Sequence, residues 1–343
     1  MVENHLVMSD FAQKRDLSDP RTVSNFGKIV KTTSNLNLLT VLTVCDIMGV
    51  GPGALNNWKA QLLRELYTNT RNLIKGGLDT QGKNKPYEIA KSTLTDLLVD
   101  WDNLEIQREI DRHYPAYWQG LDTNTQYIFA NLFKSFGSKK IVSHYEVDED
   151  RDATRAQFVM QDHPGIFSRL TGAIALANAN VIDARTYTTS DGYATPVFWI
   201  QDNDGKPFDL SRLNRLKKLI EQTLSGDVIA RDALKVRNKL KPRERNFKVP
   251  TDITFDNQGS DIYTIIEVDT RDRNSLLFDL TRTLANANIQ IASAVIATYG
   301  AQAVDVFYVK DMIGLKITAE NKQQSIREKL QQAIELGAEA SMA

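Results

Sequence analysis

The chain has 343 residues, of which 42% are hydrophobic and 25% charged, and its formal net charge is −1. This length predicts two or three domains of ordinary globular composition, and the near-neutral charge excludes a global basic field for nucleic acid. The single cysteine excludes an intramolecular disulfide, and without a signal pattern or an uninterrupted apolar run of the ~18–20 residues that cross a membrane we expect a cytoplasmic protein with no membrane contact.

The first part of the chain carries helical patterns. Asp19 before a proline is a typical helix N-cap. Residues 36–48 are apolar nearly all round except for Asp46, which predicts a buried helix. A buried carboxylate is costly unless it is hydrogen-bonded or bound to a cation, so Asp46 is either a capped core residue or a metal ligand. His5 is the only histidine nearby, and this pair by itself gives little support for a metal site.

Residues 76–150 form a predicted helical linker region. A polar stretch at 76–87 opens it, and helical patterns follow, the last of them at 123–136. Residues 113–118 (HYPAYW) are an aromatic cluster at a helix stop. Such a cluster is either a binding surface or the packing of one helix on the next, and we expect packing.

Residues 155–250 form the first of two predicted mixed units. The Asp162-His163-Pro164-Gly165 loop precedes an amphipathic helix that starts at Ile166. Pro196 cannot donate a ladder hydrogen bond, so it marks a strand start or a bulge. The elements follow one another as a strand near 158–160, a helix at 166–177, strands at 181–188 and 194–200, and a helix at 210–224. This order is most of a ferredoxin-like split βαβ unit.

The same pattern returns at residues 262–338 with an offset of 110 residues, then 109. Asp162 pairs with Asp272, and Ala184 pairs with Ala294. A fixed offset across a strand, a helix and a hairpin indicates duplication. Between the units we expect residues 243–249 to supply a fourth strand to the first unit, and residues 251–256 to form a short strand before the second.

Each unit has a tight loop into a helix N-terminus, which attracts a carboxylate. A loop glycine lets a small ligand approach the backbone. A free amino acid has a carboxylate for the helix start and an ammonium for an Asp or Asn side chain. The alternative is a simple strand-to-helix turn. The candidate ligand-binding residues are Asp162, His163, Gly165, Ile166 and Asn178 in the first unit, and Asp272, Arg273 and Ser275 in the second.

The motif DHPGIFSRLTGAIALANANVIDA resembles an ACT domain, the small-molecule-sensing βαββαβ module. The tandem pair, with DARTYTTSDG, FWIQD and AVDVFYVKD, resembles the C-terminal end of the bifunctional uridylyltransferases/uridylyl-removing enzymes. The segments HLVMSDFAQKRDLSDP, LLTVLTVCDIMGVGPG and NWKAQLLRELY are similar to the latter half of that family's HD phosphohydrolase domain. The resemblance implies an α+β chain: a partial HD domain at 1–75, the helical linker, and ACT domains at 155–250 and 262–338.

The resemblance also implies a function. The family transfers UMP to the nitrogen-signalling protein PII and removes it, under the control of glutamine, with Mg or Mn in the full-length enzyme. This chain lacks the nucleotidyltransferase motif and the adjacent His-Asp pair of the HD domain. Only His5 and Asp46 match HD metal positions. We therefore expect no tightly bound metal, and whether the chain is catalytic stays open.

The second loop departs from the ACT pattern, because Asn274-Ser275 stands where Pro-Gly is usual. The Cβ of Ser275 reduces the room for a ligand, so we expect this loop to bind more weakly or not at all.

Two other functions fit parts of the pattern. The chain is alternatively a stand-alone amino-acid-binding ACT regulatory protein without catalysis. A bare metal-dependent phosphohydrolase is disfavoured by the missing His-Asp pair. The DNA upstream of Met1 distinguishes the enzyme from the stand-alone ACT protein. An in-frame continuation into a His-Asp pair and a nucleotidyltransferase supports the enzyme.

Overall fold

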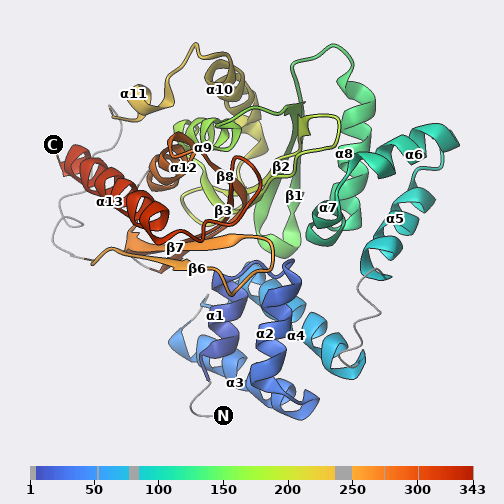
Figure 1. The fold of residues 1–343 in the computed structure, drawn as a ribbon, viewed down its shortest axis with the longest axis vertical. Helices are drawn as coiled ribbons and strands as arrows, with labels where there is room; N and C mark the ends of the chain where they lie inside the picture. Colours follow the sequence, from blue (N-terminus) through green and yellow to red (C-terminus); the bar gives the residue numbers. More distant parts are fainter. Residues whose placement is uncertain are drawn as a thin grey trace. The chain divides into compact units, whose positions relative to one another are not determined.

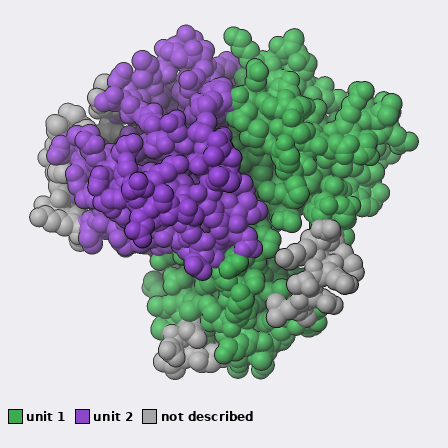
Figure 2. Space-filling view, in the orientation of Figure 1, with its two compact units in different colours: residues 1–151, 155–162, 186–197 green, residues 152–154, 163–185, 198–343 purple. Residues whose placement is uncertain are grey.

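The structure is a computed structural model that describes residues 5–51, 54–76, 85–235, 249–273, 275–299 and 301–342. Its contacts divide the chain into two compact units (Figure 2). The first comprises residues 1–151, 155–162 and 186–197, and the second comprises residues 152–154, 163–185 and 198–343. The predicted fold class, a helical part followed by two mixed α+β repeats, is confirmed (Figure 1).

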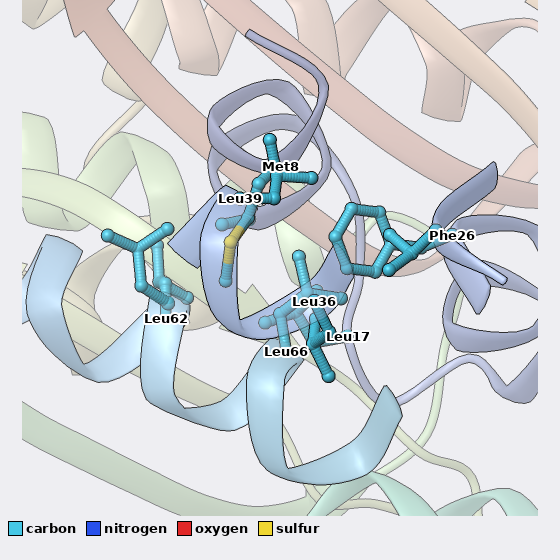
Figure 3. Packing of buried hydrophobic residues seen from close by; sticks show 10 residues of the cluster. Met8, Leu17, Phe26, Leu36, Leu39, Leu62 and Leu66 are labelled. Atoms are coloured by element: carbon cyan, nitrogen blue, oxygen red, sulfur yellow. The ribbon is translucent and has the colours of Figure 1, made fainter. Parts of the chain in front are cut away.

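Four helices at the start of the first unit pack around one apolar core (Figure 3). They are α1 (Val7–Lys14), α2 (Pro20–Val30), α3 (Thr33–Val50) and α4 (Asn57–Gly76). The predicted N-cap of α2 is confirmed, because the Asp19 carboxylate accepts a hydrogen bond from the Arg21 N–H. The core residues come from these helices and the turn after α1, namely Met8, Ala12, Leu17, Phe26, Val30, Leu36, Leu39, Leu62, Leu63 and Leu66.

The helix α3 exists as predicted, but the prediction that it is buried is wrong. Leu38, Val41 and Met48 are 56%, 63% and 62% exposed, because the packing partners α1, α2 and α4 cover the opposite side of the helix. Asp46 is exposed too, so its carboxylate carries no burial cost. Among the described residues α3 is the one helix long and apolar enough to cross a membrane, a test that some helices of soluble proteins also pass.

Four further helices follow in the described part of the first unit: α5 (Lys85–Leu97), α6 (Asn103–Arg112), α7 (Pro115–Gly120) and α8 (Thr123–Phe136). His113 stacks on Tyr117 with ring centroids 3.7 Å apart, and Trp118 packs edge-on against both rings. All three rings are buried. The aromatic cluster therefore packs helices together, as predicted.

The strands of the first unit are β1 (Ile141–Asp148), most of β2 (Ala153–Gln161) and β4 (Tyr193–Ala194), with the short 3-10 helix η3 (Glu149–Arg151) between the first two. β1 and β2 are neighbours in the sheet. β4 pairs antiparallel with the end of β2, with Met160 opposite Ala194. The predicted fourth strand at 243–249 lies almost entirely outside the described residues, and Val249 itself is not in a strand.

The second unit holds the rest of both repeats. The first repeat supplies α9 (Ile166–Leu176), β3 (Asn180–Arg185), most of β5 (Val197–Gln201), η4 (Leu210–Arg212), α10 (Leu213–Ser225) and α11 (Ala230–Lys235). The second supplies β6 (Asp252–Asp256), β7 (Thr264–Arg271), α12 (Leu276–Asn286), β8 (Ile289–Tyr299), β9 (Gln302–Asp311) and α13 (Glu320–Met342). β5 begins directly after Pro196, which confirms the strand start predicted there.

Within this unit the strand order is β5-β3-β8-β9-β7-β6. The predicted short strand before the second repeat is confirmed as β6, which pairs antiparallel with β7, with Phe255 opposite Ile266. β6, the outer strand beside β7, thus precedes the β7-α12-β8-β9 core in the chain. The sheet is ferredoxin-like, with its edge supplied from the N-terminal side.

The two repeats meet at a local pseudo-two-fold axis. β3 pairs antiparallel with β8 so that Ala184 lies opposite Ala294, its partner at the 110-residue offset. On the helical layer, α9 packs on α12 (Figure 1), and the hydroxyls of Thr171 and Thr281, again 110 residues apart, are hydrogen-bonded at 3.0 Å. The residues that the sequence alignment pairs are therefore symmetry partners in space, which confirms the duplication.

Candidate functional site

The first predicted ligand loop is a tight turn at the N-terminus of α9. Gly165 adopts φ +84°, a left-handed conformation that favours glycine. Its carbonyl accepts hydrogen bonds from the Arg169 N–H at 3.0 Å and from the Ser168 hydroxyl at 2.9 Å. Ile166 is 4% exposed and anchors the first helical turn, whereas His163 is exposed. The loop therefore presents backbone at a helix start, as predicted.

Asp162, in the first unit, is tied to the hairpin at residues 186–197. Its carboxylate accepts a hydrogen bond from the Thr188 hydroxyl at 2.8 Å, and its N–H donates to the Gly192 carbonyl at 3.0 Å. Asn178, also a predicted site residue, has φ +57° in the turn after α9 and is exposed. Asp162 orders the loop and Asn178 shapes a turn, and ligand contact by either side chain stays a prediction.

A pocket of about 430 Å³ lies beside Gly165 in the second unit. This volume is within the range of small-molecule sites. Four helices form its three walls: the first turn of α9, the end of α10 with the start of α11, and one face of α12. Its lining residues are Pro164, Gly165, Ser168, Arg169, Thr223, Gly226, Val228, Ile229, Ala230, Arg231, Phe278, Arg282, Ala285 and Asn286. The loop of the first repeat thus faces a helix of the second.

Among the described residues the lining is basic and contains no Asp, Glu, His, Cys or Lys. General acid–base or nucleophilic chemistry usually needs one of those groups. Guanidinium groups, hydroxyls and backbone N–H groups instead bind carboxylates and other oxygen acceptors. The arrangement is therefore suited to holding a small ligand through its oxygen atoms.

The second predicted ligand loop is closed by its own side chain. Ser275 repeats the left-handed conformation of Gly165, with φ +64°. The Arg273 side chain is only 5% exposed, and its Nη1 lies 2.6 Å from Asp279 Oδ2 and 3.3 Å from Ser275 Oγ. Its Nη2 donates to the Ala333 carbonyl of α13 at 3.5 Å. Asn274 lies outside the described residues.

Asp272 and Asp305 put two carboxyl groups near each other behind this second loop. Asp305 is 2% exposed on β9, and its Oδ1 has no hydrogen-bond partner among the described residues. Burial raises the pKa of Asp305 well above its ordinary value, and the neighbouring Asp272 raises it further. Burial and the Asp272 carboxyl thus both favour the neutral form of Asp305 over the charged form.

The counterpart of the pocket across the pseudo-two-fold axis is filled. At the 110-residue offset, Phe278 stands for Ser168 and Gly172 stands for Arg282. A Cβ on Gly172 would lie 2.7 Å from the Ala230 methyl and 2.9 Å from the Phe278 ring. This side holds an apolar cluster made by Leu176, Ala230, Leu234 and Phe278, with Ala175, Leu219, Val228 and Ala233 packed against it. The helix α11 thus seals one half of the pair and lines the pocket in the other.

The two predicted metal positions do not by themselves make a metal centre. His5 lies just before α1, Asp46 lies in α3, and both are exposed. Among the described residues no group of three or more His, Cys, Asp or Glu side chains is arranged to hold a metal ion. Since protein metal sites take about three or four protein ligands, these two residues do not fit a complete site.

The sequence analysis missed the residues that give the pocket its character: Arg169, Thr223, Arg231 and Arg282. They lie on four helices, α9, α10, α11 and α12, that only tertiary packing brings together. The repeat alignment did contain one signal, because Arg282 replaces a glycine at a position facing the axis. A charged side chain on one copy of an otherwise apolar seam marks a departure from symmetry.

Two protein-family models match the chain. The ACT domain matches residues 154–220, and the ACR9-like, ACT-like domain matches residues 252–338. Among curated proteins, bifunctional uridylyltransferase/uridylyl-removing enzymes are similar along nearly the whole chain. Those of Cereibacter sphaeroides and Ruegeria pomeroyi are 60% and 57% identical over 99% and 100% of this chain, and 36% and 38% of their own length. That of Azospirillum brasilense is 43% identical over 97% of this chain and 36% of its own. The chain thus spans about a third of the length of these relatives.

Proposed function

We propose that this chain, which carries two ACT domains and is similar along nearly its whole length to about a third of the bifunctional uridylyltransferase/uridylyl-removing enzymes, is the regulatory part of such an enzyme. In this proposal the ACT pair binds glutamine and thereby controls uridylylation and deuridylylation of PII in the cytoplasm. The observation that carries the proposal is the pocket beside Gly165, at the seam of the two repeats.

An amino acid suits this pocket in size and in the groups it offers. Its α-carboxylate has the N-terminal end of α9 and the guanidinium groups of the lining as partners. The left-handed Gly165 leaves the backbone accessible, since a Cβ there would have only the Ser168 hydroxyl within 4 Å. Because the lining lacks catalytic groups, the ligand acts as an effector and is not consumed.

The first unit offers a route from the loop to the helical region. Asp162 is bonded to the hairpin at residues 186–197, as described above, and that hairpin is bonded to the end of α6. The Ser190 N–H donates to the Arg112 carbonyl at 2.9 Å, and Arg112 Nε lies 3.1 Å from Asp191 Oδ2. Arg112 also pairs with the buried Glu109 at 2.8 Å. A ligand that moves the loop therefore has hydrogen-bonded elements through which to displace α6.

The divalent metal of the longer enzyme, Mg or Mn, belongs to this proposal as well. His5 and Asp46 would supply only some of its ligands, and the remaining ligands would come from elsewhere in such an enzyme. The catalytic steps are likewise assigned to the longer enzyme, and this chain supplies the regulation.

The test is a calorimetric titration of glutamine into the chain and two matched glycine variants. Gly165→Val puts a branched side chain at the pocket rim and should abolish measurable binding. Gly205→Val is the control, because Gly205 has the same left-handed backbone, with φ +72°, in a turn that does not line the pocket. Absence of glutamine binding to the wild type, or equal binding by Gly165→Val, would refute the proposal.

A further inference from the structure

The helix α11 lies in the connection between the two repeats, after α10 and before β6, and it takes part in both halves of the seam. Ala230 and Leu234 are 5% and 4% exposed and belong to the apolar cluster that fills the counterpart of the pocket. Ile229, just before α11, and Arg231 line the pocket itself. Displacing α11 would therefore uncover the filled half and remove part of a wall from the pocket.

The packing that holds α11 in place is small. The helix has six residues, and helices of that length are not stable by themselves in water, so tertiary contacts must hold it. Of its described side chains Ala230 and Leu234 are buried. The Ala230 methyl lies against α9 at Gly172, where a Cβ would be only 2.7 Å away. The Val228 N–H donates to the Gln222 carbonyl of α10 at 3.0 Å.

Two opposing terms set the stability of this packing. Fixing the backbone of α11 costs conformational entropy, and the burial of two side chains offsets that cost. Elements held by little buried apolar surface open at a lower free energy than the whole fold does. The helix α11 is thus suited to detach from α9 while the sheet and the longer helices stay folded.

A ligand in the pocket interacts with the two states of α11 differently. Ile229 is 63% exposed and Arg231 is exposed on the wall that α11 contributes, so both can contact a ligand. When α11 is detached, this part of the wall is missing and the ligand has fewer partners. A ligand that binds one of two states more tightly shifts the equilibrium toward that state.

We propose that α11 is a ligand-responsive strap, which alternates between a state packed on α9 and a detached state and is shifted toward the packed state by a ligand in the pocket. The inference rests on the proposed function and adds its conformational switch. Detachment uncovers Phe278, so the same motion that breaks the pocket opens its filled counterpart. The two halves of the seam are then alternatives, which limits binding to one ligand per pair of repeats. Ligand binding also fixes the start of the connection between the repeats.

The first test is hydrogen exchange, followed by mass spectrometry, on the full chain with and without glutamine. At a free glutamine concentration of about 100 times the Kd, the amides of α11 should exchange about 100-fold more slowly, because glutamine must dissociate before α11 detaches. The amides of β6 are the control and should exchange at an unchanged rate, because β6 contributes no residue to the described lining. No slowing in α11, or equal slowing in β6, would overturn the proposal.

The second test weakens α11 without touching the pocket. Leu234→Ala removes a buried side chain that does not line the pocket, so it should speed exchange in α11 and weaken glutamine binding by about tenfold or more. Leu336→Ala is the matched control, because Leu336 is a helical leucine that is 58% exposed on α13, and it should bind as the wild type does. Circular dichroism verifies that both variants are folded.

The outcomes separate this inference from the proposed function. If glutamine binds the wild type and Leu234→Ala equally tightly, α11 is not coupled to the pocket, and the inference fails while the proposed function stands. If glutamine does not bind the wild type, both fail.

Discussion

The loops before α9 and before α12 have the same backbone and different contents. Gly165 and Ser275 share a left-handed conformation, and so do Asn178 and Asn288 in the turns after the two helices. The first loop borders a pocket. The second is covered by Arg273, whose guanidinium is bonded to Asp279 and to α13. Duplication has preserved the backbone of a ligand loop, while the side chain at position 273, a histidine at the equivalent position 163, closes the second loop.

The largest expected effect on stability concerns the apolar cluster around Phe278 and α11. Phe278 is 6% exposed in the apolar cluster with α11, so Phe278→Ala should lower the free energy of unfolding by about 3–5 kcal/mol. Ser168→Ala, at the symmetry-related position beside the pocket, should lower it by about 1 kcal/mol or less. Urea denaturation of both variants measures the difference. Equal losses would mean that the two halves are packed alike.

The next effect concerns the closed loop. Arg273→Met removes a buried guanidinium and leaves Asp279 without its 2.6 Å partner, so it should cost about 1.5–3 kcal/mol of folding free energy. His163→Met, at the equivalent exposed position of the first loop, should change stability by less than about 0.5 kcal/mol. Thermal unfolding of the two variants and the wild type measures the difference. If Arg273→Met is as stable as the wild type, the guanidinium does not hold the second loop closed.

A smaller effect on stability is expected at Gly172, near the pseudo-two-fold axis between the repeats. Gly172→Ala would normally favour a helix, but its Cβ would lie 2.7 Å from Ala230 and 2.9 Å from Phe278. We therefore expect a net destabilisation of about 1–2 kcal/mol, because overpacking outweighs helix propensity. Limited proteolysis at Arg231 should become faster in this variant, because α11 packs less closely on α9. A gain in stability would contradict the close packing of α11 on α9.

The smallest effect depends on pH. The pKa of Asp305 is raised in the folded state above its ordinary value of 3.8, so the folded chain holds a proton that the unfolded chain releases. Stability from this group is full below that value and is lost as pH rises toward the folded pKa. Asp305→Asn should then be more stable than the wild type at pH 7 and should lose this advantage near pH 4, where the wild-type carboxyl is protonated in both states. Denaturation at both pH values tests the sign.

The sequence predicted what local rules and repetition control. The 110-residue offset identified the two units, and the Thr171–Thr281 and Ala184–Ala294 partners follow from it. The tight turn before α9 was predicted from its Pro-Gly sequence, and the structure adds that Gly165 is left-handed. It did not predict the position of α11 or the guanidinium of Arg282 in the pocket, because non-local packing sets both.

The exposure of α3 was missed for a related reason. Its apolar periodicity gave the helix correctly, but burial depends on which partners are present. In the described part of the chain α1, α2 and α4 cover one side. Periodicity on its own therefore predicts a helix more reliably than it predicts the number of neighbours around it.

The central claim is that one of the two duplicated loops binds a ligand. Calorimetric titration of glutamine into the wild type, Gly165→Val and Ser275→Val tests it directly, because both variants place the same side chain at symmetry-related left-handed positions. The account predicts one glutamine per chain, bound by the wild type and by Ser275→Val and not by Gly165→Val. Two glutamines per chain, or binding that survives in Gly165→Val and is lost in Ser275→Val, would contradict it.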